Sequence, residues 1–155
     1  LNNKMKTKFF ALFLILIFLT NCGYQPIYSN KDSLKIYIKT ISLEGDKKIN
    51  RRILLLTNLK NQNSGSPPYS LKLISNKKIE VVARDNSGNA TIYRTKITTT
   101  FSLEHEGKIF KQKKFSSNFS YNNILNSFEL SQYQKTIEEN LINKIVKKII
   151  IFINI

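Results

Sequence analysis

Three stretches of alternating residues, joined by two glycine-containing turns, constrain the fold of this chain more than any other feature. They cover residues 69–83, 90–104 and 108–121, and residues 86–89 (Asn-Ser-Gly-Asn) and Glu106-Gly107 separate them. Glycine and asparagine tolerate the positive φ angles that tight hairpin turns require. Tyr93, Ile97 and Phe101 alternate with polar residues in the second stretch, which is typical of a half-buried strand. The pattern predicts three antiparallel strands, with a bulge or bend at the polar residues 75–78 of the first.

Periodic segments flank these strands. Residues 34–41 alternate as well, with Leu34, Ile36 and Ile38 on one face, and predict a further strand. Residues 47–60 have apolar residues at helical spacing behind Asp46, which is suited to cap the helix. A second helix is predicted over residues 128–153, and its inner stripe comprises Leu130, Tyr133, Ile137, Leu141, Ile145, Ile149 and Phe152. The predicted fold is α/β, an α+β sandwich of order β-α-β-β-β-α with two amphipathic helices on one face of a four-stranded mixed sheet.

The N-terminal residues have the layout of a secretory signal. Lys4, Lys6 and Lys8 precede an unbroken apolar run of eleven residues, 9–19, and Cys22 follows shortly after it. The alternative, a permanent transmembrane helix, needs roughly 20 apolar residues. We therefore expect a signal peptide over residues 1–21, a tether over 22–33 and a single domain over 34–155.

Cys22 is the only cysteine of the chain, and residues 19–23 (Leu-Thr-Asn-Cys-Gly) resemble a bacterial lipobox. The resemblance implies a diacylglycerol on the thiol, cleavage before Cys22 and an acyl group on the new amine. Several acyl chains together anchor a protein stably to a membrane. The alternative is a small buried cysteine. Export implies an oxidising compartment, but a single cysteine leaves no intramolecular disulfide.

The chain is strongly basic. Its formal charge is +15, and without the three lysines of residues 1–21 it is +12. Such an excess attracts nucleic acid, or anionic lipids and sugar phosphates at a membrane. Export argues against nucleic acid as a partner. A lysine-rich composition biased by an AT-rich genome is the competing explanation for the total charge.

The candidate anion-binding site is a cluster of basic residues on the polar face of the central hairpin, residues 69–104, and on the strand that follows it. Arginine binds phosphate with a planar fork and lysine binds it as a point charge, so a cluster of both could hold a phosphorylated headgroup. An ordinary solvated sheet face is the alternative. The candidate residues are Arg84, Arg94, Lys96, Lys111, Lys113 and Lys114.

Little in the sequence indicates catalysis or a metal. His105 is the only histidine, and strand alternation sends its neighbours Glu104 and Glu106 away from it. We therefore expect no enzyme activity, no catalytic residue, no metal site and no cofactor besides the lipid on Cys22. The tail at residues 149–155 is apolar on all sides, which predicts either cover by a partner or a fraying helix end.

Several motifs together resemble the LPS-assembly lipoprotein (LptE) family in its alphaproteobacterial form. Residues 22–28 (Cys-Gly-Tyr-Gln-Pro-Ile-Tyr) are similar to the opening of the processed family members. The paired Arg51-Arg52 of the first helix, and Ser120-Tyr121-Asn122 before the last, also fit the family pattern. The order of strands and helices extends the resemblance over nearly the whole processed chain.

The resemblance implies a non-enzymatic role at the outer membrane. Family members assist assembly of a large outer-membrane β-barrel of the LptD type, plug its lumen and help deliver lipopolysaccharide to the outer leaflet. Gly23 after the cysteine is similar to the family pattern for sorting to the outer membrane. We therefore expect the protein to be anchored by its lipid to the outer membrane, with the domain facing the periplasm or inside the barrel lumen. The alternative is another periplasm-facing outer-membrane lipoprotein, a lipid- or solute-binding transport accessory.

Overall fold

The computed structural model describes residues 36–61 and 68–154. Cys22, the expected signal peptide and the expected tether lie outside these residues. The elements are β1 (Tyr37–Gly45), α2 (Lys47–Thr57), β2 (Pro68–Arg84), β3 (Ala90–His105), β4 (Lys108–Asn122) and α3 (Ser127–Asn154). The order β-α-β-β-β-α is the one predicted from the sequence.

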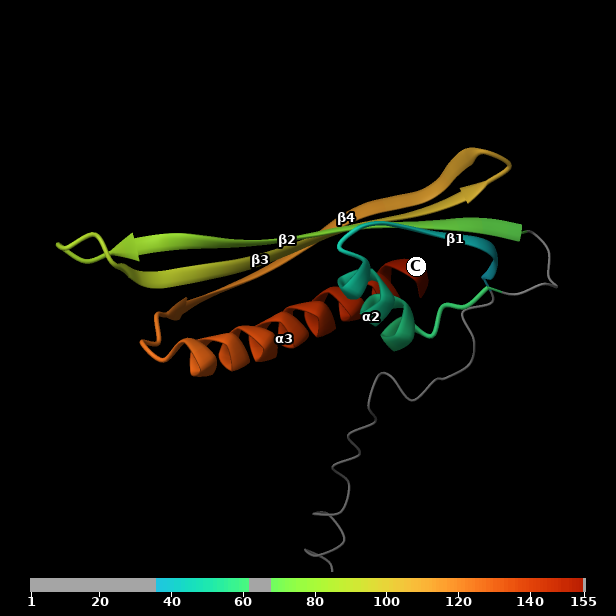
Figure 1. Ribbon diagram of the computed structural model, residues 1–155. Helices are drawn as coiled ribbons and strands as arrows, with labels where there is room; N and C mark the ends of the chain where they lie inside the picture. Colours follow the sequence, from blue (N-terminus) through green and yellow to red (C-terminus); the bar gives the residue numbers. More distant parts are fainter. Residues whose placement is uncertain (1–35, 62–67, 155) are drawn as a thin grey trace, which may run out of the picture. The chain divides into compact units, whose positions relative to one another are not determined.

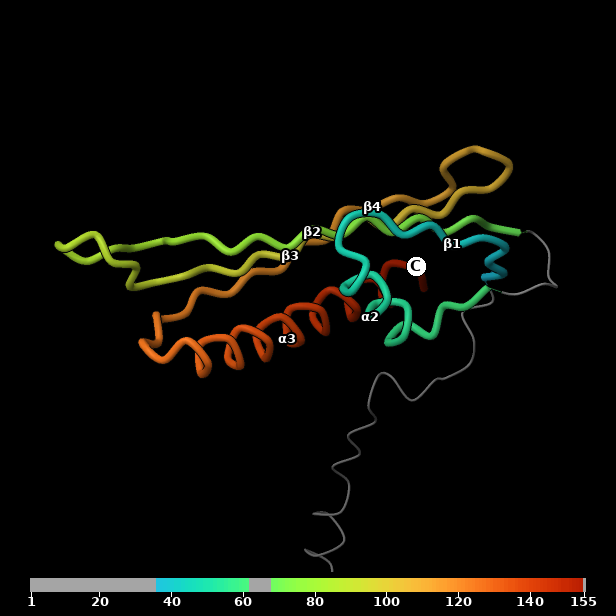
Figure 2. The backbone as a smooth tube through the Cα atoms, viewed as in Figure 1, coloured from blue at the N-terminus to red at the C-terminus, as the bar shows by residue number. Residues whose placement is uncertain are grey.

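One four-stranded sheet carries both helices on the same face (Figure 1). The strands lie in the order β1-β2-β3-β4, with β1 parallel to β2 and the other neighbours antiparallel. This confirms the predicted mixed sheet and α+β fold. The hairpin of β2 and β3 extends past the first turn of α3 (Figure 2). No helix within residues 36–61 and 68–154 combines the length and the apolar character needed to cross a bilayer.

The junction between β1 and α2 depends on Gly45 and Asp46. Gly45 has φ +73°, and a Cβ there would lie 2.2 Å from the carbonyl oxygen of Ser75. The Asp46 amide donates to that same oxygen at 2.8 Å. The Asp46 carboxylate accepts from the Ile49 amide at 3.1 Å, which confirms the predicted N-cap. The helix ends three residues earlier than predicted, because Asn58 adopts a left-handed conformation with φ 55°.

Both predicted hairpin turns are present. Glu106 and Gly107 have φ 51° and 73°, the left-handed pair of a two-residue turn between antiparallel strands. In the other turn the Asp85 carboxylate accepts from the amides of Ser87 and Asn89 at 2.9 and 2.8 Å. These bonds stabilise the carboxylate anion and hold the pKa of Asp85 below its usual value.

The hydrophobic core lies between the sheet and the helices. Ile97, Phe101 and Leu103 of β3 are fully buried, as the predicted alternation requires. Along α3, the predicted stripe supplies Ile137, Leu141, Ile145 and Ile149 to the core, and α2 supplies Ile49 and Ile53. Burying such aliphatic side chains contributes roughly 1.5–3 kcal/mol each to stability.

The predicted bulge or bend at residues 75–78 is wrong. Pairing with β3 continues without a register shift through these residues, and the bulge in β2 lies instead between Val81 and Arg84. Two of the four polar side chains, those of Ser75 and Lys77, have partners on the helix side. The Ser75 hydroxyl is buried and lies 2.8 Å from the Thr99 hydroxyl, and Lys77 reaches α3.

Lys77 takes part in a charged junction that joins β2 and both helices. The Glu138 carboxylate of α3, only 8% exposed, pairs with Lys77 and, at 3.0 Å, with Lys48 of α2. Burial disfavours the charged form of Glu138, but the hydrogen bonds and charges of the two lysines outweigh it. The pKa of Glu138 therefore lies below its usual value.

Candidate functional site

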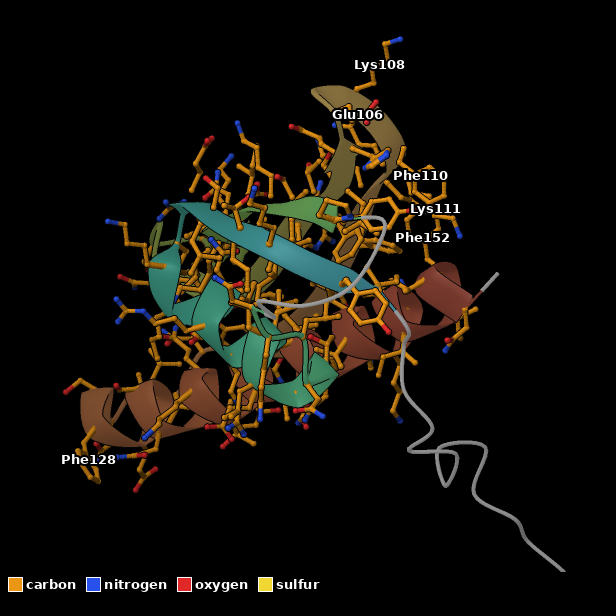
Figure 3. All side chains as sticks on the ribbon, turned by 90° about the vertical axis from the view of Figure 1, so that its right-hand side faces the viewer. Glu106, Lys108, Phe110, Lys111, Phe128 and Phe152 are labelled. Atoms are coloured by element: carbon orange, nitrogen blue, oxygen red, sulfur yellow. The ribbon has the colours of Figure 1, made fainter. Side chains whose placement is uncertain are left out.

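Two hollows lie between the edge strand β4 and the helix α3. One of them, of about 690 Å³, is here called the basic hollow. Phe110, Lys111 and Phe152 lie together there, beside the C-terminal turns of α3 (Figure 3). The basic hollow is lined by Phe110, Lys111, Gln112, Lys113, Phe115, Lys148, Ile151 and Phe152.

Strand alternation brings two lysines of β4 onto the helix side of the sheet. Lys111 and Lys113 pair with Leu103 and Phe101 of β3, which are core residues, so they share the face of Phe115. The ammonium of Lys111 lies 5.8 Å from the Phe152 ring centroid, and that of Lys113 lies 5.4 Å from it. A cation over an aromatic face is attracted by the electrons of the ring.

The aromatic floor of the basic hollow is fixed by packing. The Phe152 ring meets Phe115 and Phe101 edge to face, with centroids 5.8 and 6.2 Å apart. From the neighbouring helical turn, Lys148 donates to the carbonyl oxygen of Ser116 at 3.1 Å. Three lysines therefore surround an apolar floor, and no acidic residue is among the residues that line this hollow. Such a site suits an anionic amphiphile, with its charge on the lysines and its apolar part on the rings.

A second hollow, of about 390 Å³ and here called the distal hollow, lies farther along the same two elements. Phe119 of β4 and Tyr133 of α3 are 43% and 40% exposed beside it. Its lining residues come from β4 and α3 alone and are Phe119, Tyr133, Thr136, Ile137, Asn140, Leu141, Asn143, Lys144 and Lys147.

The structure divides the six predicted anion-binding residues among three places. Arg94, Lys96 and Lys114 lie on the sheet face opposite the helices, because their register partners alternate with the core residues. Lys96 lies four positions along β3 from Thr100, the partner of Lys114, so the three do not converge. The Arg94 Nε donates to the Ser120 hydroxyl at 3.1 Å.

Arg84 lies apart from the other five, at the tip of the β2–β3 hairpin. Its Nη1 donates to the carbonyl oxygen of Gly88 at 2.7 Å. Lys111 and Lys113 lie in the basic hollow on the helix side. The expected single cluster on one polar face is therefore wrong, since adjacent residues of a strand point to opposite faces.

Sequence reasoning missed Lys148 as a partner of these lysines. The helical periodicity of α3 identifies Ile149 and Phe152 as part of its apolar stripe, but it does not indicate that Lys148 faces β4. The unusually apolar tail at residues 149–155 was a signal for this site in the sequence. Ile151 is 54% exposed and Phe152 is half-buried, and both line the basic hollow.

His105 lines neither the basic hollow nor the distal hollow. Its Nδ1 lies 3.0 Å from the carbonyl oxygen of Pro68, and its ring packs against Tyr69 with centroids 5.4 Å apart. Its Nε2 is 3.9 Å from the Glu106 carboxylate. Among residues 36–61 and 68–154, no group of three or more histidine, aspartate and glutamate side chains could hold a metal ion.

No protein-family model matches the sequence, and no curated protein matches it either. Solved structures do resemble it. Rare lipoprotein B of Shewanella oneidensis is 20% identical, with a TM-score of 0.52 over 71% of this chain and 92% of that one. A minor lipoprotein of Acinetobacter baumannii is 15% identical, with a TM-score of 0.53 over 74% and 90%. Lipoprotein B of Nitrosomonas europaea is 7% identical, with a TM-score of 0.54 over 74% and 80%. The chain shares the fold of these bacterial lipoproteins, in agreement with its resemblance to the LPS-assembly lipoprotein family.

Proposed function

We propose that this chain is a lipid-anchored lipoprotein that assists assembly of, and plugs, a large outer-membrane β-barrel of the LptD type. In this role it takes part in delivery of lipopolysaccharide to the outer leaflet. The observation that carries the proposal is the fold, which the chain shares with bacterial lipoproteins. The signal-like residues 1–21 and Cys22 support it from the sequence. The proposed role is non-enzymatic and needs no metal or cofactor beyond the diacylglycerol and N-acyl lipid of Cys22.

The basic hollow gives this role a contact for lipopolysaccharide. Lys111, Lys113 and Lys148 carry positive charge beside the exposed Phe110 and Ile151. Phosphate groups bind lysine as a point charge, while the apolar floor takes the hydrocarbon part of a glycolipid. The proposed location is the outer membrane, with the domain facing the periplasm or inside the barrel lumen.

The alternative function is a transport accessory that binds a lipid or small solute in the periplasm. The size of the basic hollow favours this alternative, because about 690 Å³ lies within the usual range of small-molecule sites. Such a protein would need no barrel partner and would leave lipopolysaccharide transport unaffected.

Depletion of the chain in its own bacterium separates the two functions. If the proposed function is right, depletion lowers the amount of lipopolysaccharide at the cell surface and the amount of folded barrel in the outer membrane. A copy of the gene with Cys22 intact restores both. Unchanged surface lipopolysaccharide and unchanged barrel in depleted cells would falsify the proposal and leave the accessory role.

A further inference from the structure

The strand β4 is one edge of the sheet. It pairs with β3 on one side, and the sheet formed by the described residues has no strand on its other side. Its register with β3 is unbroken from Lys111 to Asn122. An edge strand turns every second peptide group away from the sheet, so it offers amide donors and carbonyl acceptors to another extended chain.

The second half of this edge has less protection against pairing than the first, although Lys148 of α3 donates to the carbonyl oxygen of Ser116 there. Proteins commonly protect edge strands with lysines, prolines, bulges or short length. The first half of β4 has such protection, with lysines at 108, 111, 113 and 114 and an extra residue at Phe110. Residues 115–122 (Phe-Ser-Ser-Asn-Phe-Ser-Tyr-Asn) have no charge and no proline.

The opposite edge of the sheet is shorter than β4 and partly occupied. β1 has only 9 residues, and a register shift lies between Ile38 and Thr40. Ile38 also forms a bridge with Asn61, which occupies part of this edge. The long regular edge of the sheet is therefore that of β4.

The distal hollow lies beside the uncharged half of β4, residues 115–122. A strand added to β4 would turn alternate side chains toward the helix side, where the exposed rings of Phe119 and Tyr133 offer apolar contacts. Lys144 and Lys147 of α3 line the same hollow and would lie near that strand. Both are exposed, and no acidic residue lines the hollow.

We propose that residues 115–122 accept an extended segment of a partner polypeptide by strand addition. The segment has apolar side chains toward the distal hollow and acidic side chains toward Lys144 and Lys147. A second copy of this chain fits poorly, because two processed chains with formal charges of +12 repel one another. The inference goes beyond the proposed function, since it requires neither a barrel nor a glycolipid.

The first test uses the processed full-length lipoprotein in detergent micelles and a synthetic probe. The probe is a peptide matched in length to residues 115–122, with threonine at every second position and with valine and glutamate in turn at the positions between, so that both face the helix side. We expect it to bind and to slow amide hydrogen exchange at alternate residues of 115–122. A peptide of the same sequence, N-methylated at alternate residues, should bind at least about tenfold more weakly, because it lacks the donors for the ladder.

The second test reverses the charges beside the strand. In the variant K144E/K147E we expect the glutamate peptide to lose affinity about tenfold or more and a valine–lysine peptide to gain affinity. Lys135 of α3 is exposed and does not line the distal hollow, so K135E is the matched control and should bind as the wild type does.

Three results would overturn the proposal. The N-methylated peptide could bind as tightly as its parent, which would show charge attraction without strand addition. Exchange could slow elsewhere, or nowhere, when the peptide is added. The free protein could form a dimer with residues 115–122 already protected, which would make a second copy the occupant.

Discussion

Glu138 is the residue at which three elements converge, because its carboxylate pairs with Lys48 of α2 and Lys77 of β2. The two lysines differ in exposure, at 74% and 33% of their side chains. An exposed lysine contributes little to an ion pair, since water solvates it almost as well. Loss of Lys77 therefore leaves the buried carboxylate with less compensation than loss of Lys48.

We expect K77M to lower the free energy of unfolding by about 1–3 kcal/mol and K48M by less than about 1 kcal/mol. Urea denaturation of the two variants at neutral pH measures both. Equal losses, or a larger loss for K48M, would contradict the assignment of Lys77 as the main partner of Glu138.

The lowered pKa of Glu138 also makes stability depend on pH. The unfolded state takes up a proton near the usual value of 4.5, while the folded state resists it. The contribution of Glu138 is thus fully present at neutral pH and is lost as the pH falls below about 4.5. Unfolding followed from pH 7 to pH 3 should show a shallower acid decline for E138Q than for the wild type. Parallel declines would show that Glu138 is not responsible.

Gly45 is a second residue at which the structure predicts a destabilising substitution. We expect G45A to lower the free energy of unfolding by at least about 2 kcal/mol, because it adds a clash with the Ser75 carbonyl to the strain of positive φ. G88A is the matched control, with φ +84° and open space around it, and should cost only about 1 kcal/mol. Denaturation midpoints of the two variants measure the difference, and equal costs would rule out the clash.

At the scale of elements, the packing of α3 on β4 creates the basic hollow from residues far apart in the sequence. Lys113 lies in the basic hollow, and its neighbour Lys114 lies on the opposite face of the same strand. The two lysines therefore form a matched pair for testing the site.

We expect K113Q/K148Q to weaken binding of purified lipopolysaccharide by roughly tenfold, because two of the three cations in the basic hollow are lost. K114Q should change the affinity by less than about twofold, as expected for a distant exposed charge. Titration of the processed protein with fluorescent lipopolysaccharide measures all three affinities. An equal loss for K114Q would place the contact on the outer face of the sheet instead.

The sequence predicted the elements well because their signals are local. Alternation, turn residues and the Asp46 cap define β3, both hairpins and the start of α2. The polar segment 75–78 was misread because the partners of Ser75 and Lys77, which are Thr99 and Glu138, are distant in the sequence. Strand alternation places Lys113 on the same face as Phe115, toward the helices. We predicted the outer face for Lys113 because charged side chains are usually exposed to solvent. Lys148 joins the basic hollow through the packing of α3 on β4, which no local pattern encodes.

At the scale of the whole molecule, a predicted membrane anchor precedes a folded basic domain in the sequence. Cys22 lies outside the described residues, so its lipid is a prediction of the sequence alone. We expect a C22A variant to incorporate no labelled palmitate and to be missing from the outer-membrane fraction, because lipid transfer to the thiol precedes sorting. Labelling and fractionation of cells that make either form measure this. Palmitate on the C22A chain would contradict lipidation at Cys22.

The central claim is that this domain works as a subunit of a lipopolysaccharide-transport barrel. The most direct measurement is purification of the affinity-tagged, lipid-anchored chain from its own outer membrane in a gentle detergent, followed by mass determination of the complex. We expect the chain to elute in equimolar complex with a large β-barrel protein and with lipopolysaccharide bound. Elution of the chain alone, without a barrel protein, would contradict the account.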